Sequence, residues 1–304
     1  MLIVFGSINL DIAVQVPHLP KPGETVLGGG ALISPGGKGA NQAHAAALYG
    51  MPTTMFGAVG RDAFAAPATA NLRAAAVNID GVCVCDNPTG IATIGVTQTG
   101  ENAIVVSPGA NLCAIGDAVS DAKLLTARVL LMQLEVQAQE CFRLARRAKE
   151  QGCLVILNAS PLADEMQLDA RALDIVIVNK LELAELCARQ EIFGIDPIDQ
   201  ARLLAKALEV DVLVTLGEEG AFLMQSNGHC TACQAMAVTA VDTTGAGDTF
   251  AGVFAAAMAA GEPIRRSMQA ASVAAGIACT RPGAQIAQPT RTEVDAGLSQ
   301  LWPQ

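Results

Sequence analysis

The segment from Asp242 to Asp248 places a carboxylate directly after a glycine-rich turn. The apolar run at 250–258 predicts that a helix follows the turn. Because a helix N-terminus carries partial positive charge, the turn suits a phosphate or a developing oxyanion. Asp248 beside such an anion hole suggests a base that takes a proton while backbone amides hold charge. Those amides belong to Gly245, Ala246 and Gly247. The segment alone leaves an alternative open, in which the turn only connects a strand to a helix and Asp248 complements the helix dipole.

A second glycine-rich turn, from Gly36 to Asn41, also leads into an alanine-rich helix, which we expect to reach Tyr49. Glycines allow a ligand to approach the backbone closely, and Asn41 offers both a donor and an acceptor to a hydroxyl-rich ligand. Lys38 suits a phosphate. Read by itself, however, this segment is explained equally well as a plain loop with a solvated lysine.

Two further polar groups follow predicted strands. Asn9 and Asp11 come at the end of the first strand, where an Asx turn is the alternative to a binding role. Asn179 and Glu182 have the spacing of a helix N-cap with a capping box. They would also serve to hold the water shell of a hydrated Mg²⁺, and the sequence leaves both interpretations open.

The elements that must position these residues alternate between strands and helices. Beyond residue 120, apolar strands at 129–134, 154–157, 175–178 and 212–216 are separated by helices such as 138–151 and 199–209. This pattern predicts a parallel sheet covered on both faces. Ligands of such sheets bind at the carboxyl ends of the strands, so we expect Glu135, Asn158, Asn179 and Gly217 to line one crevice.

The first half of the chain adds strands at 2–8 and 53–57, and a helix at 65–76. Residues 11–34 and the two β-like runs at 91–97 and 103–107 predict hairpins, the second with a loop at 98–102. We expect them to form a small sheet that acts as a lid. A further hairpin is predicted at 221–238.

Composition narrows the class of protein. The formal net charge of −10 argues against non-specific binding to nucleic acid or to an anionic membrane. No apolar run reaches the roughly 18 to 20 residues that span a bilayer, and the start of the chain lacks the basic region of a signal peptide. Nine scattered cysteines favour reduced thiols in the cytoplasm.

Taken together and in this order, these segments resemble the ribokinase family, also called the PfkB carbohydrate kinases. The segment 242–248 resembles the C-terminal signature of the family and 36–41 its N-terminal signature, and the likeness covers nearly the whole chain. The resemblance implies a single domain over 1–304, with an α/β/α sandwich, a mostly parallel central sheet and a β-sheet lid. It also implies transfer of the γ-phosphate of ATP to a hydroxymethyl group of a pentose, D-ribose above all.

By this resemblance, Asp248 is the catalytic base, and Gly245, Ala246 and Gly247 form the anion hole. The positions that match sugar contacts are Asn9, Asp11, Gly37, Lys38, Gly39, Asn41 and Glu135. Those that match nucleotide contacts are Asn179, Thr215, Leu216, Gly217, Glu218, Glu219, Gly220, Gly247 and Ser272. A site for a monovalent cation such as potassium matches Asp242 and Thr244 with the backbone of Ala278, Arg281 and Gly283.

Two positions depart from the family pattern. Ala287 stands where some ribokinases offer a serine hydroxyl to the cation, and Ala65 replaces a glycine of the family pattern. A nucleoside kinase or another sugar kinase of the same fold is the main alternative, although 3% aromatic residues leave few side chains to stack on a base. A non-catalytic sugar- or nucleotide-binding module is a third reading. Apolar alternation at 91–96 favours a homodimer formed through the lid.

Overall fold

The computed structural model describes residues 1–97, 99–163 and 166–301. Its main element is a nine-stranded sheet in the order β13-β12-β11-β10-β9-β8-β1-β4-β5. The strands from β11 to β5 are parallel to one another, and the hairpin β12–β13 adds two antiparallel strands at one edge. In chain order the strands are β1 (Leu2–Phe5), β4 (Thr53–Gly60), β5 (Asn78–Cys85), β8 (Val129–Gln133), β9 (Leu154–Asn158), β10 (Ile175–Asn179), β11 (Asp211–Thr215), β12 (Ala221–Met224) and β13 (Cys230–Cys233).

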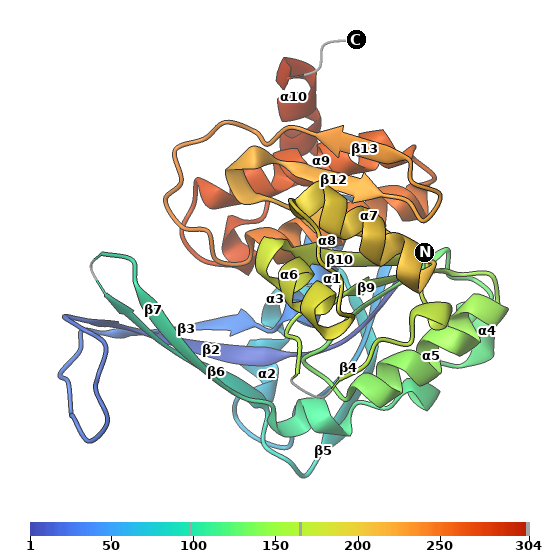
Figure 1. Cartoon of the computed structure of the whole chain (residues 1–304). Helices are drawn as coiled ribbons and strands as arrows, with labels where there is room; N and C mark the ends of the chain where they lie inside the picture. The colour runs from blue at the N-terminus through green and yellow to red at the C-terminus, as the bar shows by residue number, and fades with distance from the viewer. Residues whose placement is uncertain (98, 164–165, 302–304) are drawn as a thin grey trace.

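Helices cover both faces of this sheet, because alternate residues of each central strand are buried on opposite sides. Leu131 of β8 packs on one side and Leu130 on the other. The first face carries α1 (Lys38–Leu48), α3 (Ala70–Ala74), α8 (Ala246–Ala260), α9 (Ile264–Cys279) and α10 (Arg291–Leu301). The second face carries α4 (Asp121–Leu124), α5 (Ala138–Glu150), α6 (Lys180–Arg189) and α7 (Pro197–Leu208). The prediction of an α/β/α sandwich is confirmed (Figure 1).

A second, smaller sheet extends away from the body, to the left in Figure 1. Its order is β3-β2-β6-β7, with β2 (Asn9–Val16), β3 (Ala31–Gly36), β6 (Gly90–Thr97) and β7 (Asn102–Ser107). Both predicted hairpins are present, and β2 and β6 join them in parallel. Gln98, in the predicted loop at 98–102, lies outside the described residues. We call these four strands the small sheet.

The single helix expected over 65–76 is two short helices, α2 (Ala65–Ala68) and α3. They are separated at Thr69, whose hydroxyl donates to the carbonyls of Ala65 and Ala66. The first strand ends at Phe5 and not at residue 8, because the chain leaves the sheet there and enters β2 of the small sheet at Asn9.

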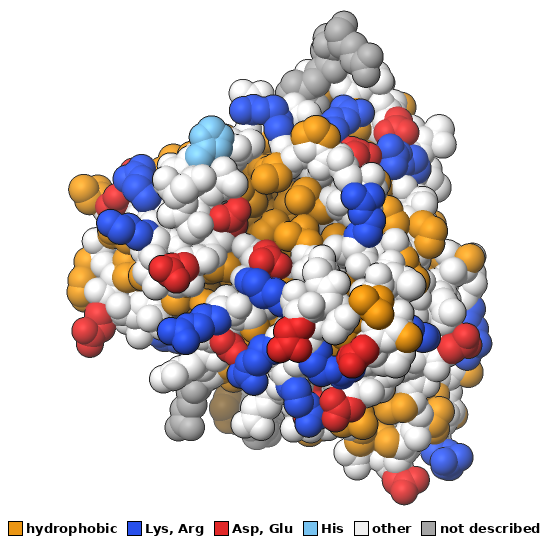
Figure 2. All heavy atoms as spheres, turned by 90° about the vertical axis from the view of Figure 1, so that its right-hand side faces the viewer, with side chains coloured by type: hydrophobic (Ala, Val, Ile, Leu, Met, Phe, Trp, Pro, Cys, Tyr) orange, Lys and Arg blue, Asp and Glu red, His pale blue; other side chains and the backbone are white. Residues whose placement is uncertain are grey.

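On the face shown in Figure 2, basic and acidic side chains are interspersed around a hollow of apolar side chains. Neither sign of charge dominates this face. Among the described residues, no helix is both long and apolar enough to cross a membrane.

Candidate active site

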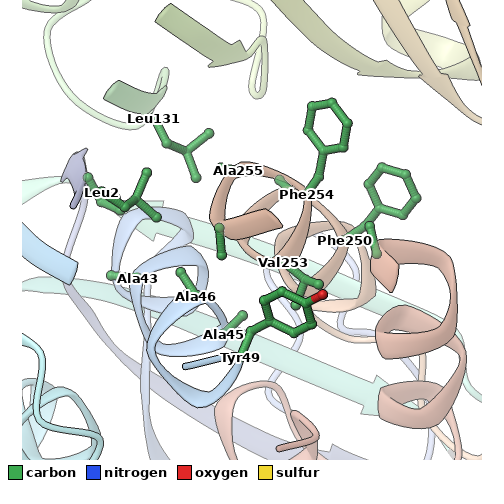
Figure 3. Close-up of a cluster of buried hydrophobic side chains, with 14 of the residues drawn as sticks. Leu2, Ala43, Ala45, Ala46, Tyr49, Leu131, Phe250, Val253, Phe254 and Ala255 are labelled. Atoms are coloured by element: carbon green, nitrogen blue, oxygen red, sulfur yellow. The ribbon is translucent and has the colours of Figure 1, made fainter. Parts of the chain in front are cut away.

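The two glycine-rich turns predicted from the sequence are the N-termini of two helices that pack side by side. Helix α1 begins at Lys38 after Gly37, and α8 begins at Ala246 after Gly245. Both glycines have positive φ, 86° and 73°, a conformation that side chains other than glycine rarely adopt. Figure 3 shows how small side chains such as Ala45 and Ala46 of α1 face Val253 of α8, which brings the two helices together.

Asp248 lies in the first turn of α8 and is buried against α1. Its Oδ2 accepts a hydrogen bond from Asn41 Nδ2 at 2.9 Å, and its Oδ1 accepts one from Gln42 Nε2 at 2.9 Å. Each carboxylate oxygen keeps a lone pair for a further donor. Two side chains of α1 therefore fix the orientation of the Asp248 carboxylate, which a residue that only complements the helix dipole would not require.

Asn41, which we expect to contact a sugar, makes two side-chain hydrogen bonds to other protein residues. Its Nδ2 donates to Asp248, and its Oδ1 accepts from Gln285 Nε2 at 3.0 Å. One N–H of the amide remains for a sugar hydroxyl. Asn41 thus orients Asp248 in addition to any contact that it makes with a substrate.

Three carboxylates of the site, those of Asp11, Glu135 and Asp248, act on one another through their charges, and we call them the acidic cluster. Burial raises the pKa of Asp11 to about 7, and the charges of Glu135 and Asp248 add to this effect. Asp11 Oδ1 is buried and has no hydrogen-bond partner among the described residues. Glu135 Oε2 accepts from Ser7 Oγ at 2.6 Å and from the Lys38 amide at 3.0 Å, so its position is fixed.

Lys38 is half-buried among these carboxylates. Burial alone would lower the pKa of Lys38, but the surrounding negative charges outweigh burial and raise it above its ordinary value. The three carboxylates responsible are those of Asp248, Glu135 and Glu182. These charges favour the charged form of the ammonium group.

Gly37 and Gly39 pack so closely against the neighbouring backbone that neither position has room for a side chain, which the sequence alone does not show. A Cβ on Gly39 would lie 2.6 Å from the Ser7 amide nitrogen, and one on Gly37 would lie 2.8 Å from that of Asn9. Helix α1 can therefore start against the turn between β1 and β2 only if both residues are glycine. Asn9, the first residue of β2, accepts from Asn111 Nδ2 at 2.7 Å through its Oδ1, which leaves its own side-chain N–H groups free to donate.

A cavity of about 670 Å³ opens on the other side of the glycine turn of α8. Six residues expected to contact a nucleotide line it, namely Thr215, Gly217, Glu218, Gly220, Gly247 and Ser272. Leu216, Glu219 and Asn179 are absent from its lining. The volume lies within the range of about 300 to 1,000 Å³ that is typical of small-molecule sites.

The opposite wall of the cavity was not predicted. It consists of the segment 235–240 after β13, together with Ala275, Gly276 and Cys279 of α9. Ser272 Oγ donates to the Gln234 carbonyl at 2.9 Å and so holds this segment against α9. The apolar character of the segment is the one sequence signal that was available, and it does not distinguish a cavity wall from a core.

The chain matches the model of the family described as pfkB family carbohydrate kinase over residues 1–291. The chain therefore belongs to the PfkB family. It is 34% identical to the ribokinase of Schizosaccharomyces pombe, with 98% of each chain covered. It is 35% identical to the ribokinase of Haemophilus influenzae, with 96% of each chain covered.

Solved structures agree with this family assignment. The ribokinase of Thermotoga maritima superimposes with a TM-score of 0.90 at 32% identity, covering 98% of this chain and 99% of that one. The ribokinase of Arabidopsis thaliana, solved in complex with ribose and ATP, has a TM-score of 0.86 at 32% identity and covers 98% of both chains. Like the other PfkB kinases, this chain is a phosphotransferase that acts on an alcohol group.

In this PfkB kinase, Asn179 and Glu182 form a capping box at the start of α6, as their spacing in the sequence predicts. Asn179 Oδ1 accepts from the amides of Leu181 and Glu182, and Glu182 Oε2 accepts from the Asn179 amide at 2.8 Å. Glu182 keeps its second oxygen for another partner. The capping box therefore does not exclude a role beside a hydrated metal ion.

The segments expected to bind a monovalent cation lie next to one another in this kinase. Asp242 Oδ1 accepts from the Thr244 amide at 2.9 Å, and its Oδ2 accepts from the Gly283 amide at 2.8 Å. These bonds outweigh partial burial and lower the pKa of Asp242, which keeps it charged. The carbonyl of Ala278 accepts from the Arg281 amide at 3.1 Å. Ala287 is fully buried and brings no hydroxyl.

Ala65, the second departure from the family pattern, begins α2 without strain. Its amide donates to Asp62 Oδ1 at 3.2 Å, as the Phe64 amide does at 3.0 Å. A side chain is therefore tolerated at this position, where the family pattern has glycine.

Proposed function

We propose that this PfkB kinase transfers the γ-phosphate of ATP to the 5-hydroxyl group of D-ribose. The observation that carries the proposal is the acidic cluster of Asp11, Glu135 and Asp248 beside the glycine turn of α8. Support also comes from its curated relatives, several of which are named ribokinases. A structural relative has been solved with both ribose and ATP.

The sugar side of the site is suited to a ligand with several hydroxyl groups. A sugar hydroxyl would donate to Asp11 Oδ1, which otherwise stays buried without a partner at a cost of about 1–3 kcal/mol. The free amide of Asn9 would donate to another sugar oxygen. Glu135, fixed by Ser7 and the Lys38 amide, would accept from a third hydroxyl.

Asp248 would accept the proton of the attacking hydroxyl through the lone pair that its protein partners leave free. Phosphoryl transfer depends mainly on positioning and on charge neutralisation, so a held carboxylate is more useful than a strongly basic one. The amides of Gly245, Ala246 and Gly247 would neutralise the transferring phosphoryl group at the N-terminus of α8. Lys38 would add a positive charge close to the same point.

The cavity beside Gly247 would hold the nucleotide. Its apolar wall, formed by 235–240 and by Ala275 and Gly276, suits a flat base, and Thr215 and Gly217 offer polar groups. The adenine would thus lie between two segments that the fold brings together, with the triphosphate directed towards Asp248.

Two metal ions fit the residues present. The free oxygen of Glu182, supported by Asn179, would hold water molecules of a Mg²⁺ ion that is bound to the triphosphate. The charged carboxylate of Asp242, with Thr244 and the backbone of Ala278, Arg281 and Gly283, would hold a K⁺ ion. When bound, these ions supply positive charge for the phosphates and for the anion-binding turn.

The small sheet would act as the lid of the sugar site within a single domain, since it carries Asn9 and Asp11 at its base. We also propose a homodimer through this sheet. Apolar side chains are exposed on its outer strands, including Ile33 at 57% and Val105 at 71%. The nine cysteines are all free thiols, which fits our proposal of a cytoplasmic location.

The test is an ADP-release assay over pentoses, hexoses, deoxyribose and nucleosides, with wild type and Asp248→Asn. We expect D-ribose to give the highest kcat/KM, and Asp248→Asn to lower kcat by at least about a hundredfold, in the range of general acid–base effects. Preference for a nucleoside or another sugar would overturn the substrate assignment. Turnover of Asp248→Asn within a few-fold of wild type would refute the base assignment.

A further inference from the structure

A chain of buried side-chain amides connects the main sheet to Asp248. Gln133, at the end of β8, donates through Nε2 to Gln42 Oε1 at 2.6 Å. Gln42 Nε2 donates to Asp248 Oδ1 at 2.9 Å and to Asn158 Oδ1 at 3.0 Å. Gln42 and Gln133 are fully buried, so water does not compete for these bonds. The chain links β8 and β9 of the main sheet to the carboxylate on α8.

The direction of every bond in this chain is set by a main-chain carbonyl. Asn158 Nδ2 donates to the Ile177 carbonyl at 3.2 Å, and because a carbonyl can only accept, Asn158 must present its Oδ1 to Gln42. Gln42 must then present its amide nitrogen to Asn158, and the same nitrogen faces Asp248. A flipped Gln42 amide would place its oxygen against two acceptors.

Gln42 has no polar atom left for a substrate. Its two N–H groups go to Asp248 and Asn158, and its oxygen accepts from Gln133. Because the Gln42 side chain is fully buried and both of its N–H groups are engaged, it offers no donor to the sugar or the nucleotide. Any effect of Gln42 on turnover must therefore pass through Asp248.

Two donors grip the Asp248 carboxylate from different sides. Gln42 holds Oδ1 and Asn41 holds Oδ2, so together they fix the plane of the carboxylate and the direction of its remaining lone pairs. A general base works only when its lone pair points at the proton that it takes. Asn41 can exchange partners when the sugar arrives, whereas Gln42 is tied to the main sheet through Gln133 and Asn158.

We propose that Gln42 is a positioning residue for the phosphoryl-transfer step. It fixes the carboxylate of Asp248 in the orientation that accepts the proton of the attacking hydroxyl. The inference rests on the proposed function, in which Asp248 is the base.

The experiment compares Gln42→Met with wild type, because methionine has nearly the same length and shape but no N–H group. We expect kcat to fall about 10- to 100-fold, as for the loss of one hydrogen bond to a charged group. The KM for the sugar should stay within about threefold, since Gln42 does not touch the sugar. Gln288→Met is the matched control: Gln288 is buried, donates to the main-chain carbonyl of Asn41 and pairs with His44, but makes no hydrogen bond to Asp248. Its kcat should stay within about threefold of wild type.

A double-mutant cycle with Asp248→Asn separates positioning from packing. If Gln42 acts only through Asp248, Gln42→Met should cause no further loss of kcat in the Asp248→Asn background. A purely structural role would give the same fold loss in both backgrounds. Gln42→Glu adds a second test, because it has the size of glutamine but sets a carboxylate against Asp248, and we expect a larger loss than for methionine. Near-wild-type kcat for both Gln42 variants would overturn the proposal.

Gln133→Met keeps the proposal testable if the Gln42 variants do not fold. It removes the donor to Gln42 and also a buried oxygen of Gln133 that lacks a partner, so its cost in stability is smaller. We expect kcat to fall about threefold to tenfold, with an unchanged KM, because a looser Gln42 positions Asp248 less well. An unchanged kcat would count against the inference.

All measurements use whichever sugar of the panel the wild type turns over fastest. If that sugar is not ribose, the proposed function fails while the role of Gln42 is still tested. If ribose is turned over but Gln42→Met and Gln133→Met match wild type, the positioning role alone is refuted.

Discussion

The raised pKa of Asp11 predicts that kcat/KM for the sugar changes around neutral pH, where a carboxylate with an ordinary pKa stays ionised. Burial, with the charges of Glu135 and Asp248, raises the pKa of Asp11 to about 7 in the free protein. The ionised form accepts hydrogen bonds from sugar hydroxyls through both oxygens, whereas the protonated form presents one of its oxygens as an O–H donor. At this pKa, about a tenth of the protein carries an ionised Asp11 at pH 6 and about nine-tenths at pH 8.

The assay is kcat/KM for the sugar at saturating ATP between pH 5.5 and 8.5, since this parameter reports groups of the free enzyme. We expect it to rise about tenfold from pH 6 to pH 8, with a midpoint near 7. Asp11→Asn should lower kcat/KM and remove the dependence around pH 7. If kcat/KM does not change from pH 6 to 8, or if the rise near pH 7 is still present in Asp11→Asn, ionisation of Asp11 does not control sugar binding.

The same shift has a consequence for stability that needs no substrate. Because the folded-state pKa of Asp11 is raised above its unfolded value, this residue stabilises the fold at low pH, and the contribution is lost as pH rises through about 7. Asp11→Asn, which cannot ionise, should therefore raise Tm relative to wild type at pH 8 more than at pH 5. Thermal unfolding at the two pH values measures the difference, and an equal change at both would contradict it.

Three further predictions follow from packing, the cation and the small sheet. A Cβ on Gly252 would lie 2.4 Å from the main-chain carbonyl oxygen of Gln42, so Gly252→Ala should push α1 and α8 apart. We expect the fold to lose about 1–3 kcal/mol of stability and kcat to fall. An unchanged Tm would contradict this. Turnover should be several-fold faster in potassium than in tetramethylammonium, and Asp242→Ala should abolish the difference; equal rates for wild type would refute the cation site. Light scattering should give twice the monomer mass of 31.2 kDa for wild type and the monomer mass for Val105→Asp. Val84→Asp, at an exposed position of β5 outside the small sheet, should stay dimeric, and a monomeric wild type would refute the dimer.

The helix starts at Lys38 and Ala246 were predictable from sequence because they depend on neighbours in the chain. A glycine before each helix start and an alanine-rich or apolar run after it are local signals, and α8 adds an acidic residue in its first turn. The alternation of apolar strands and helices likewise predicted the parallel sheet. Two separated signatures in the right order then identified the family.

The assignment of partners within the site was less predictable. The sequence predicts a sugar contact for Asn41 but not the hydrogen bond that it donates to Asp248, 207 residues away in the chain. Ser272 was expected beside the nucleotide and lines the cavity, yet it also holds the Gln234 carbonyl. Polar side chains have several possible partners, and no local pattern says which one the fold will bring close.

The two glycine-rich turns, the acid that follows the second one and the layered fold that carries them are readable from the sequence, because they follow from local propensities and from the alternation of strands and helices. The hydrogen bonds that connect Gln42, Gln133 and Asn158 to Asp248 are visible only in the folded protein, since the order of β8, β9 and β10 in the sheet and the packing of α1 on α8 bring these residues together. Those three amides look like ordinary polar residues in the chain. Their role depends on burial, because a buried amide hydrogen-bonds to a fixed protein group where an exposed one would bond to water.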